Sequence, residues 1–394
     1  MHPQIPPEIL RNIFRLATFT TTSLNVMDWD PHWPYAWASE KADPTLSYES
    51  TLPTKKALTL VSRSFRDLSL EFLFELVQLF HTRNAQLLLD MILSQTTGTG
   101  KRPAKWIKYI MVDLDKDDDS RLMDGVLKKI FPHCENLAAF GYDSKERMRD
   151  PWNDVDSSDL MASIPLSITT LEWHRDSLGN SLNSLQSHTA LRNLRVSGFL
   201  VHDNHVVALP FITHLYLQPP FTIPASPWGL PSISHLRMDA FFAVDRFLAE
   251  SESKDTIRSL YIADSRTRLG GFPQLLASLP KLGTFSYDFN IGLQVLLPSS
   301  SWLGAARHAS LSHIYLFCNG GVNRSFSTIR DGFSDHLQPL MALHLPLTIG
   351  IMHAHLLFEH GDFREGGYGA ADKQRFFDDL SSSLSSSEVR VIVK

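Results

Sequence analysis

The sequence predicts an α/β protein in which a small N-terminal helical unit precedes an irregular solenoid built on a parallel sheet. Two observations support this prediction. Apolar residues recur at helical spacing in the first 80 residues, and a strand-like apolar motif returns every 21 to 31 residues beyond residue 100. A repeat of that period, with one strand and one helical stretch per unit, is typical of a solenoid.

Composition limits the classes of protein to which the chain can belong. Hydrophobic residues make up 43% of the 394 residues, so a folded core is expected. A net charge of −5 without a basic block predicts no nucleic-acid partner, and no apolar stretch approaches the roughly 20 residues that span a bilayer. Two cysteines, Cys134 and Cys318, and the lack of a signal-like N-terminus predict a cytoplasmic or nuclear protein with free thiols.

The first helical segment is IPPEILRNIF at residues 5–14. Its two prolines suit the first turn of a helix, where the missing N–H is not needed. Apolar side chains then cover an arc of about 160° at helical spacing; they are Ile9, Leu10, Ile13, Phe14, Leu16 and Ala17. Residues 18–52 lose this periodicity and are expected to form an irregular insertion, whose tryptophans hold the loop on the body.

A second helical segment is expected to begin at Pro53. Its apolar face again covers about 160° and contains Ala57, Leu58, Leu60, Val61, Phe65 and Leu68. Residues 69–80 are apolar nearly all round, which predicts a buried third helix. Such a small unit leaves apolar surface uncovered when it stands alone.

These two segments together resemble an F-box, in particular the divergent type found in mushroom-forming fungi. The resemblance covers about 80 residues and rests on a Leu-Pro-x-Glu-[Ile/Leu]-Leu pattern and a later Val-Ser-Arg pattern. Matching positions are Pro6, Glu8, Ile9, Leu10, Ile13, Val61, Ser62, Arg63, Arg66 and Leu68. The chain departs from the pattern at Ile5 and Phe65, which replace leucine and tryptophan, and in the long insertion.

The resemblance implies that the helices dock on a Skp-type adaptor protein and, through it, on a cullin. The residues that would carry this contact are Pro6, Ile9, Leu10, Ile13, Phe14, Val61 and Phe65. Periodicity alone favours a different interpretation, in which the same apolar stripe packs on the following domain. The match to the F-box motif makes docking on an adaptor the favoured interpretation.

A strand-like motif recurs through the rest of the chain, with apolar residues at relative positions 0, 3 and 5. The first apolar residues are Ile107, Leu137, Ile168, Leu191, Ile212, Ile233, Ile257, Leu282 and Leu311. The motif resembles leucine-rich repeats of irregular form, although the family's asparagine ladder is incomplete. Residues 370–394 are expected to contribute a short helix and a final strand that cap the solenoid.

Strand alternation predicts which side chains face away from the helices, at relative positions 2, 4 and 6. Tyrosine and arginine are enriched there, as they are at protein interfaces. The expected target-binding residues are His214, Tyr216, His235, Arg237, Tyr261, His313 and Tyr315. The alternative is a polar face that contacts only solvent.

Three motif lookalikes are expected to carry no chemistry. The segment QTTGTGKR lacks the first glycine and the Ser/Thr of a phosphate-binding loop. The aspartates between residues 113 and 124 lack the glycine and the final glutamate of a calcium loop. His353, His355, His360 and Asp362 match no specific zinc spacing.

The sequence thus predicts three regions, namely a helical domain at residues 1–94, a linker at 95–105 and a solenoid at 106–394. The expected function is substrate recognition in a Skp–cullin–F-box ubiquitin ligase, with an unknown protein as target. We expect no enzymatic activity, cofactor, metal, nucleic acid or membrane. The alternative is a non-catalytic repeat scaffold that binds a partner without docking to a ligase.

Overall fold

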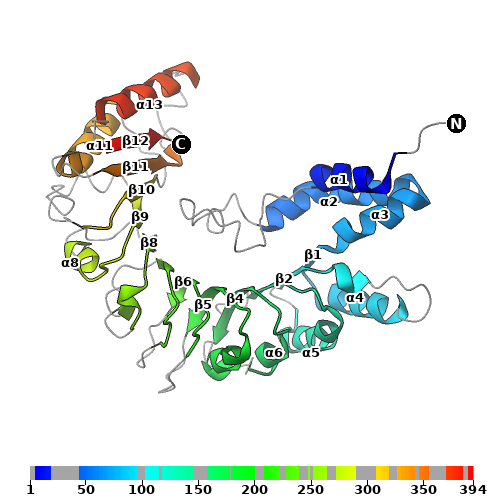
Figure 1. Cartoon of the computed structure of the whole chain (residues 1–394). Coiled ribbons are helices and arrows are strands. Elements are labelled where there is room, and N and C mark those ends of the chain that lie inside the picture. Colours follow the sequence, from blue (N-terminus) through cyan, green and yellow to red (C-terminus); the bar gives the residue numbers. More distant parts are fainter. Residues whose placement is uncertain are drawn as a thin grey trace. The chain divides into compact units, whose positions relative to one another are not determined.

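The computed structural model shows two compact units, residues 1–230 and residues 231–394 (Figure 1). The boundary between them lies inside the repeat region, just before the motif that begins at Ile233, and the sequence analysis predicted no division there. The structure describes residues 5–18, 44–95, 103–114, 118–144, 158–177, 179–199, 208–221, 228–238, 247–248, 252–263, 272–289, 308–318, 326–341, 346–354, 370–384 and 389–393. The predicted linker lies largely outside these residues, and so do most of the insertion and the histidine cluster.

The first unit begins with three helices, α1 (Pro7–Ala17), α2 (Pro44–Val61) and α3 (Arg63–Phe74). Helix α1 starts at the prolines, as predicted. Helix α2 begins at Pro44 and contains Pro53 in its interior, so the prediction of an irregular stretch up to residue 52 is wrong there. The helical conformation is interrupted at Ser62, between α2 and α3. The Ser62 side chain caps α3 by accepting a hydrogen bond from the backbone N–H of Phe65 (3.1 Å).

A parallel sheet follows in the same unit, and its strands lie in chain order. They are β1 (Leu76–Leu79), β2 (Tyr109–Leu114), β3 (Ala139–Ser144), β4 (Thr170–Ser177), β5 (Asn193–Phe199) and β6 (His214–Phe221). Helical segments connect them, namely α4 (Thr82–Gln95), η3 (Pro103–Trp106), α5 (Ser120–Ile130), η4 (Phe131–His133), α6 (Ser158–Ser163) and η5 (Gly179–Ser187). The prediction of a buried third helix at residues 69–80 is wrong at its end, because residues 76–79 form a strand that pairs with β2.

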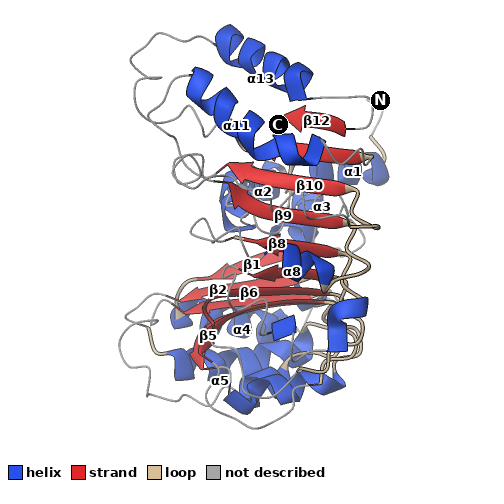
Figure 2. Cartoon of the chain, turned by 90° about the vertical axis from the view of Figure 1, so that its left-hand side faces the viewer, coloured by secondary structure: helices blue, strands red, loops and turns tan. Residues whose placement is uncertain are grey.

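The second unit repeats this plan. Its strands are β7 (His235–Met238), β8 (Ser259–Ile262), β9 (Thr284–Phe289), β10 (His313–Cys318), β11 (Leu347–Met352) and β12 (Val389–Val393). Between them lie η6 (Glu252–Asp255), α8 (Phe272–Ala277), α11 (Phe326–Met341) and α13 (Ala370–Leu384). Figure 2 shows β8, β9 and β10 as neighbouring arrows that point the same way. The helix and final strand predicted near the end of the chain correspond to α13 and β12.

The predicted repeat register agrees with the structure. Each of the nine first apolar residues, from Ile107 to Leu311, lies two residues before a strand and is buried. Relative positions 3 and 5 point their side chains to the helices, as in β9, where Tyr287 at position 5 lies against His336 of α11 with ring centroids 5.9 Å apart. Burial of this apolar side explains why a motif of only three positions specifies each strand.

The motif lookalikes show no metal geometry where they are described. Asp119 caps α5 and accepts hydrogen bonds from the backbone N–H groups of Arg121 (2.8 Å) and Leu122 (3.3 Å). No cluster of three metal-ligating side chains occurs among the residues that the structure describes. Among the described helices, none combines the length and the apolar character that crossing a bilayer requires.

Candidate interaction surfaces

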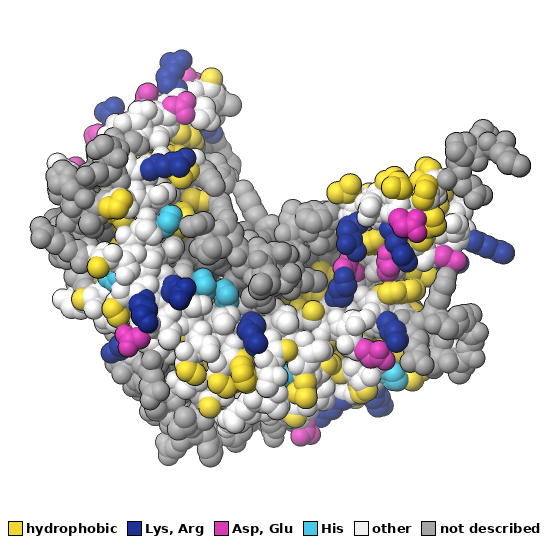
Figure 3. Space-filling view, viewed as in Figure 1, with side chains coloured by type: hydrophobic (Ala, Val, Ile, Leu, Met, Phe, Trp, Pro, Cys, Tyr) yellow, Lys and Arg dark blue, Asp and Glu magenta, His cyan; other side chains and the backbone are white. Residues whose placement is uncertain are grey.

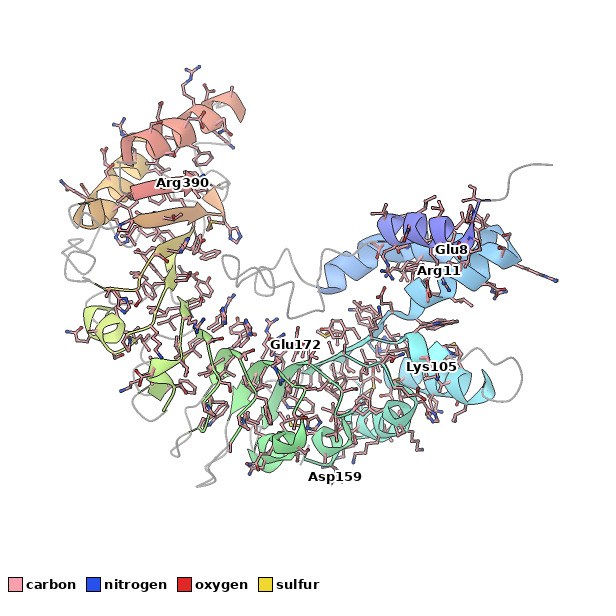
Figure 4. All side chains as sticks on the ribbon, viewed as in Figure 1. Glu8, Arg11, Lys105, Asp159, Glu172 and Arg390 are labelled. Atoms are coloured by element: carbon pink, nitrogen blue, oxygen red, sulfur yellow. The ribbon has the colours of Figure 1, made fainter. Side chains whose placement is uncertain are left out.

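One side of α1 holds the helix against α3. The rings of Phe14 and Phe65 lie 5.0 Å apart, and Phe14 is only 2% exposed. Beside them, Arg11 pairs with Glu71 of α3, with Nε and Oε1 3.1 Å apart. Figure 4 shows Arg11 on the side of α1 that faces α3. Phe14 is therefore part of the interior of this helical unit and contacts α3.

The opposite side of α1 is apolar and exposed. Ile9 and Ile13 are 50% and 48% exposed, and Leu16 is 78% exposed. At 100° per residue, these three side chains fall within an arc of about 60°, on the side of the helix opposite Phe14 and Arg11. We call Ile9, Ile13 and Leu16 the outer stripe of α1. Hydrophobic side chains gather along this part of the molecule in Figure 3.

The end of α2 adds two further exposed apolar side chains, Leu60 (83%) and Val61 (63%). They lie directly before Ser62, where the capped start of α3 holds the chain. Of the other predicted adaptor-binding residues, Pro6 is exposed, and Leu10 and Phe65 are half-buried. The sequence did not distinguish Phe14 from the outer stripe. The apolar arc of about 160° includes both the side chain that packs on α3 and the side chains that face away from α3.

A buried lysine contributes to the packing of α2 near the sheet. Lys55 of α2 is buried, and desolvation lowers the pKa of its ammonium, while the charge of Glu75 partly opposes this shift. Glu75 also accepts a hydrogen bond from the ammonium of Lys108 at 2.7 Å. Because Glu75 lies between α3 and β1, these charges link the helices to the first strand of the sheet.

In the first unit, the sheet face opposite α6 carries a buried polar cluster. Figure 4 shows Glu172 of β4 on the side away from α6, which carries Asp159. The guanidinium of Arg195 lies 3.7 Å from the Glu172 carboxylate and donates a hydrogen bond to Gln218 at 3.1 Å. It also lies over the ring of Tyr216, 4.8 Å from the centroid. Tyr216 is only 4% exposed, so this predicted target residue lies beneath its neighbour.

In the second unit, the face opposite the helices carries Arg237, Tyr261 and Asp288. The Arg237 guanidinium lies 4.4 Å from the centroid of the Tyr261 ring. The Tyr261 hydroxyl donates a hydrogen bond of 2.5 Å to the carboxylate of Asp288. The hydroxyl of Tyr261 is therefore fixed by Asp288, and its ring stacks on the Arg237 guanidinium, whose plane this stacking fixes.

Tyr315 and two further aromatic side chains extend this face across β10 and β11. The Phe317 ring lies edge-on to the Tyr261 ring, with centroids 5.1 Å apart. Its centroid is 5.5 Å from that of the His353 ring. His353 has a φ of 55°, the left-handed region that non-glycine residues seldom adopt. Tyr315 leans over Gly350, where a Cβ atom would overlap the tyrosine ring. The sequence did not reveal that Phe317 packs on Tyr261 or that Gly350 makes room for Tyr315. The role of Gly350 becomes visible only when the register of β10 and β11 places it opposite Tyr315.

The three histidines predicted to bind a target open their strands in one recurring arrangement. The hydroxyl of Thr213 donates to the Arg192 carbonyl (3.3 Å), so Nδ1–H of His214 donates to Thr213 Oγ1 (2.8 Å). Ser312 and His313 repeat this arrangement. Because each hydroxyl already donates to a carbonyl, it accepts from the ring, so each of these two histidines carries a proton on Nδ1.

The third histidine, His235, opens β7 beside Ser234. Ser234 Oγ lies 2.8 Å from its Nδ1. Burial, together with the charge of Arg258, lowers the pKa of His235 to about 4. His235 is therefore neutral at pH 7 and contributes hydrogen bonding, not positive charge, to the face.

Comparisons with known proteins leave the family of the chain open. No model of a known protein family matches the chain. No curated protein matches it. Among solved structures, one match is the crystal structure of a protein from Bacteroides fragilis, with 15% identity and a TM-score of 0.37 over 79% of this chain and 84% of that chain. At this TM-score, the likeness carries no argument about family or activity.

Proposed function

We propose that the chain is a non-catalytic substrate-recognition subunit of a Skp–cullin–F-box ubiquitin ligase. In this proposal, the N-terminal helices bind the Skp-type adaptor and the sheet face of the repeats binds a target protein. Its contribution to ubiquitin transfer is to hold the target at high effective concentration near the ligase. The F-box-like sequence motif motivates this proposal.

The single observation that carries the adaptor contact is the outer stripe of α1. An isolated amphipathic helix on a folded unit normally turns its apolar side inward. Here Phe14 and Arg11 already make the inward contact with α3, and yet Ile9 and Ile13 remain about half exposed on the other side. Burying such side chains in an interface stabilises a complex by roughly 1 kcal/mol each. A partner that covers this stripe therefore has an evident energetic basis.

The contact surface supported by the structure differs in detail from the family motif. Ile9, Ile13 and Val61 are exposed and available for contact, and Leu16 and Leu60 enlarge the same kind of surface. Phe14 acts indirectly, because it fixes the orientation of α1 on α3. We therefore assign the adaptor contact to the outer stripe together with Leu60 and Val61.

The test is co-purification of the full chain with a purified Skp-type adaptor. Substituting Ile9→Glu and Ile13→Glu together places two charges in the proposed interface, and we expect retention of the adaptor to fall at least a hundredfold. The matched control is Leu122→Glu on α5, a leucine that is 61% exposed outside the helical unit. Helix content and thermal melting confirm that both variants remain folded.

The outcomes separate the proposal from its alternative. Adaptor retained by wild type and by Leu122→Glu, but lost in the double variant, supports the ligase function. A folded wild-type chain that retains no adaptor contradicts it and leaves a repeat scaffold that binds a partner through its sheet. Loss of the adaptor in Leu122→Glu alone assigns the contact to another surface.

A further inference from the structure

We propose that the sheet face of the second unit opposite its helices binds an extended peptide segment of the target. That segment carries a carboxylate side chain at one position and an apolar side chain four residues away. Arg237 receives the carboxylate and Tyr315 contacts the apolar side chain. The inference rests on the proposed target-binding role of the repeats and specifies the chemistry of the target.

Arg237 is held in place before any ligand arrives. Its guanidinium stacks on Tyr261, and the Tyr261 hydroxyl is fixed by Asp288. Phe317 packs edge-on against the same tyrosine ring. Stacking fixes the plane of the guanidinium, and a guanidinium whose side-chain freedom is already restricted loses less entropy when it binds a carboxylate.

The charge on this face favours an acidic ligand. Strand register assigns the side chains that share the face with Arg237, and among the described positions Asp288 is the one carboxylate. Arg237 carries positive charge on this face, and Arg390 of β12, on the same face, lies five strand spacings away, about 24 Å. Asp288 already accepts the hydrogen bond of Tyr261. A ligand carboxylate beside Arg237 therefore meets a charge of opposite sign whose nearest described counter-charge, Asp288, is already hydrogen-bonded to Tyr261, and complementary charge of this kind gives specificity to an interface.

The spacing of four residues follows from the strand order. Arg237 of β7 aligns with Tyr261 of β8, Ser286 of β9 and Tyr315 of β10, so Arg237 and Tyr315 are three strand spacings apart. Neighbouring strands lie about 4.8 Å apart, which gives about 14 Å, and an extended peptide covers that distance in about four residues. Ser286 is the small residue between the two tyrosines, and its buried Oγ has no hydrogen-bond partner among the residues that the structure describes.

Tyr315 supplies the second contact. Because Gly350 has no side chain, the Tyr315 ring lies across β11, and it remains half-buried. His313 stacks beside it with an angle of 15° between the ring planes. A partly exposed tyrosine ring held between neighbours is a typical anchor for an apolar side chain of a partner.

A carboxylate fits this site better than a phosphate. Phosphopeptide recognition relies on clusters of arginines. Here one tyrosine-stacked arginine stands near Asp288, whose negative charge opposes a dianionic phosphate more strongly than a carboxylate. We therefore assign the ligand to an acidic, unphosphorylated segment.

The first experiment presents the purified full chain with an octapeptide library in which the second residue is glutamate and the other positions are randomised. We expect enrichment of apolar side chains at the sixth position. The most enriched peptide, its glutamine form and its phosphoserine form are then measured by fluorescence anisotropy. The glutamine form should bind about tenfold more weakly or worse, because a charge-assisted hydrogen bond is lost.

Two variants assign the contacts. Arg237→Gln should remove the preference for glutamate over glutamine, and Tyr315→Ala should remove the enrichment at the sixth position. Arg375→Gln, an exposed arginine on α13, is the matched control and should change neither.

Four results would overturn the inference: no enrichment, equal binding of the glutamate and glutamine peptides, tighter binding of the phosphoserine form, or a preference that survives Arg237→Gln. The library measurement contains no adaptor and uses a different surface from α1. Its failure is therefore distinguishable from failure of the ligase proposal.

Discussion

The hydroxyl of Tyr287 on β9 donates a hydrogen bond to Nε2 of His336 on α11, and the two atoms are 2.5 Å apart in the interior of the second unit. Burial lowers the pKa of His336 to about 3, so the ring is neutral at pH 7. A buried polar pair of this kind fixes which side of α11 meets the sheet.

Tyr287→Phe should destabilise the second unit. The substitution keeps the ring and removes the donor, which leaves His336 Nε2 buried without its partner. The expected loss in unfolding free energy is about 1 to 3 kcal/mol. Urea unfolding at pH 7 measures it, and an unchanged midpoint would show that the bond contributes nothing net.

Stability should fall as the pH drops below about 6.5. His336 and His235 have folded pKa values of about 3 and about 4, below the usual 6.5. Between those values and 6.5 the unfolded chain binds protons that the folded chain does not. The free energy of unfolding therefore decreases with falling pH by about 1.4 kcal/mol per pH unit for each histidine.

The pH prediction is checked by urea unfolding at pH 6.5 and pH 5. The variant His336→Gln should lose the share of the pH dependence that belongs to that histidine, although its stability at pH 7 is also lower. An identical slope in wild type and variant would contradict the assignment. Carboxylates contribute equally to both and cancel in this comparison.

Substitution by alanine should change the stability of the protein in opposite directions at two glycines. Gly125 lies inside α5 with no atom within 4 Å of a built Cβ, so Gly125→Ala should stabilise the protein by up to about 1 kcal/mol. Gly350→Ala places its Cβ against the Tyr315 ring and should cost about 1 to 3 kcal/mol. Thermal melts of both variants test this, and a stabilised Gly350→Ala would show that Tyr315 moves freely.

Phe14 should behave as a core residue. Phe14→Ala removes the contact with Phe65 and should destabilise the N-terminal helices by about 3 kcal/mol or more. Leu16→Ala, on the exposed side of the same helix, should change stability by less than about 0.5 kcal/mol. Helix content during thermal unfolding distinguishes the two, and similar losses in both variants would mean that α1 is packed differently.

Much of the sheet could be predicted from the sequence because each strand repeats one local pattern. A motif such as that beginning at Ile212 places two buried side chains at a period of two, and this fixes both strand and face. Strand β1 escaped prediction because Leu76–Leu79 follows α3 directly, and a short apolar run does not distinguish strand from helix. The start of α2 was missed because Pro53 suggested a first turn.

The candidate surfaces were predictable only in part. Alternation identified the side chains that share a face, such as Arg237 and Tyr261, but not that one stacks on the other. Burial of Tyr216 and Tyr261 depends on neighbours from adjacent strands, which are 20 or more residues away in sequence. Likewise, the distinction between Phe14 and Ile13 depends on where α3 lies, and helical periodicity does not contain that information.

The most direct test of the proposed function is hydrogen exchange of the full chain with and without a purified Skp-type adaptor. We predict slower exchange in Pro7–Ala17 and around Leu60 and Val61 when the adaptor is present, with no change in α5. An adaptor complex that leaves exchange in α1 unchanged, or the absence of any complex with the folded chain, would contradict the assignment of α1 as the docking helix.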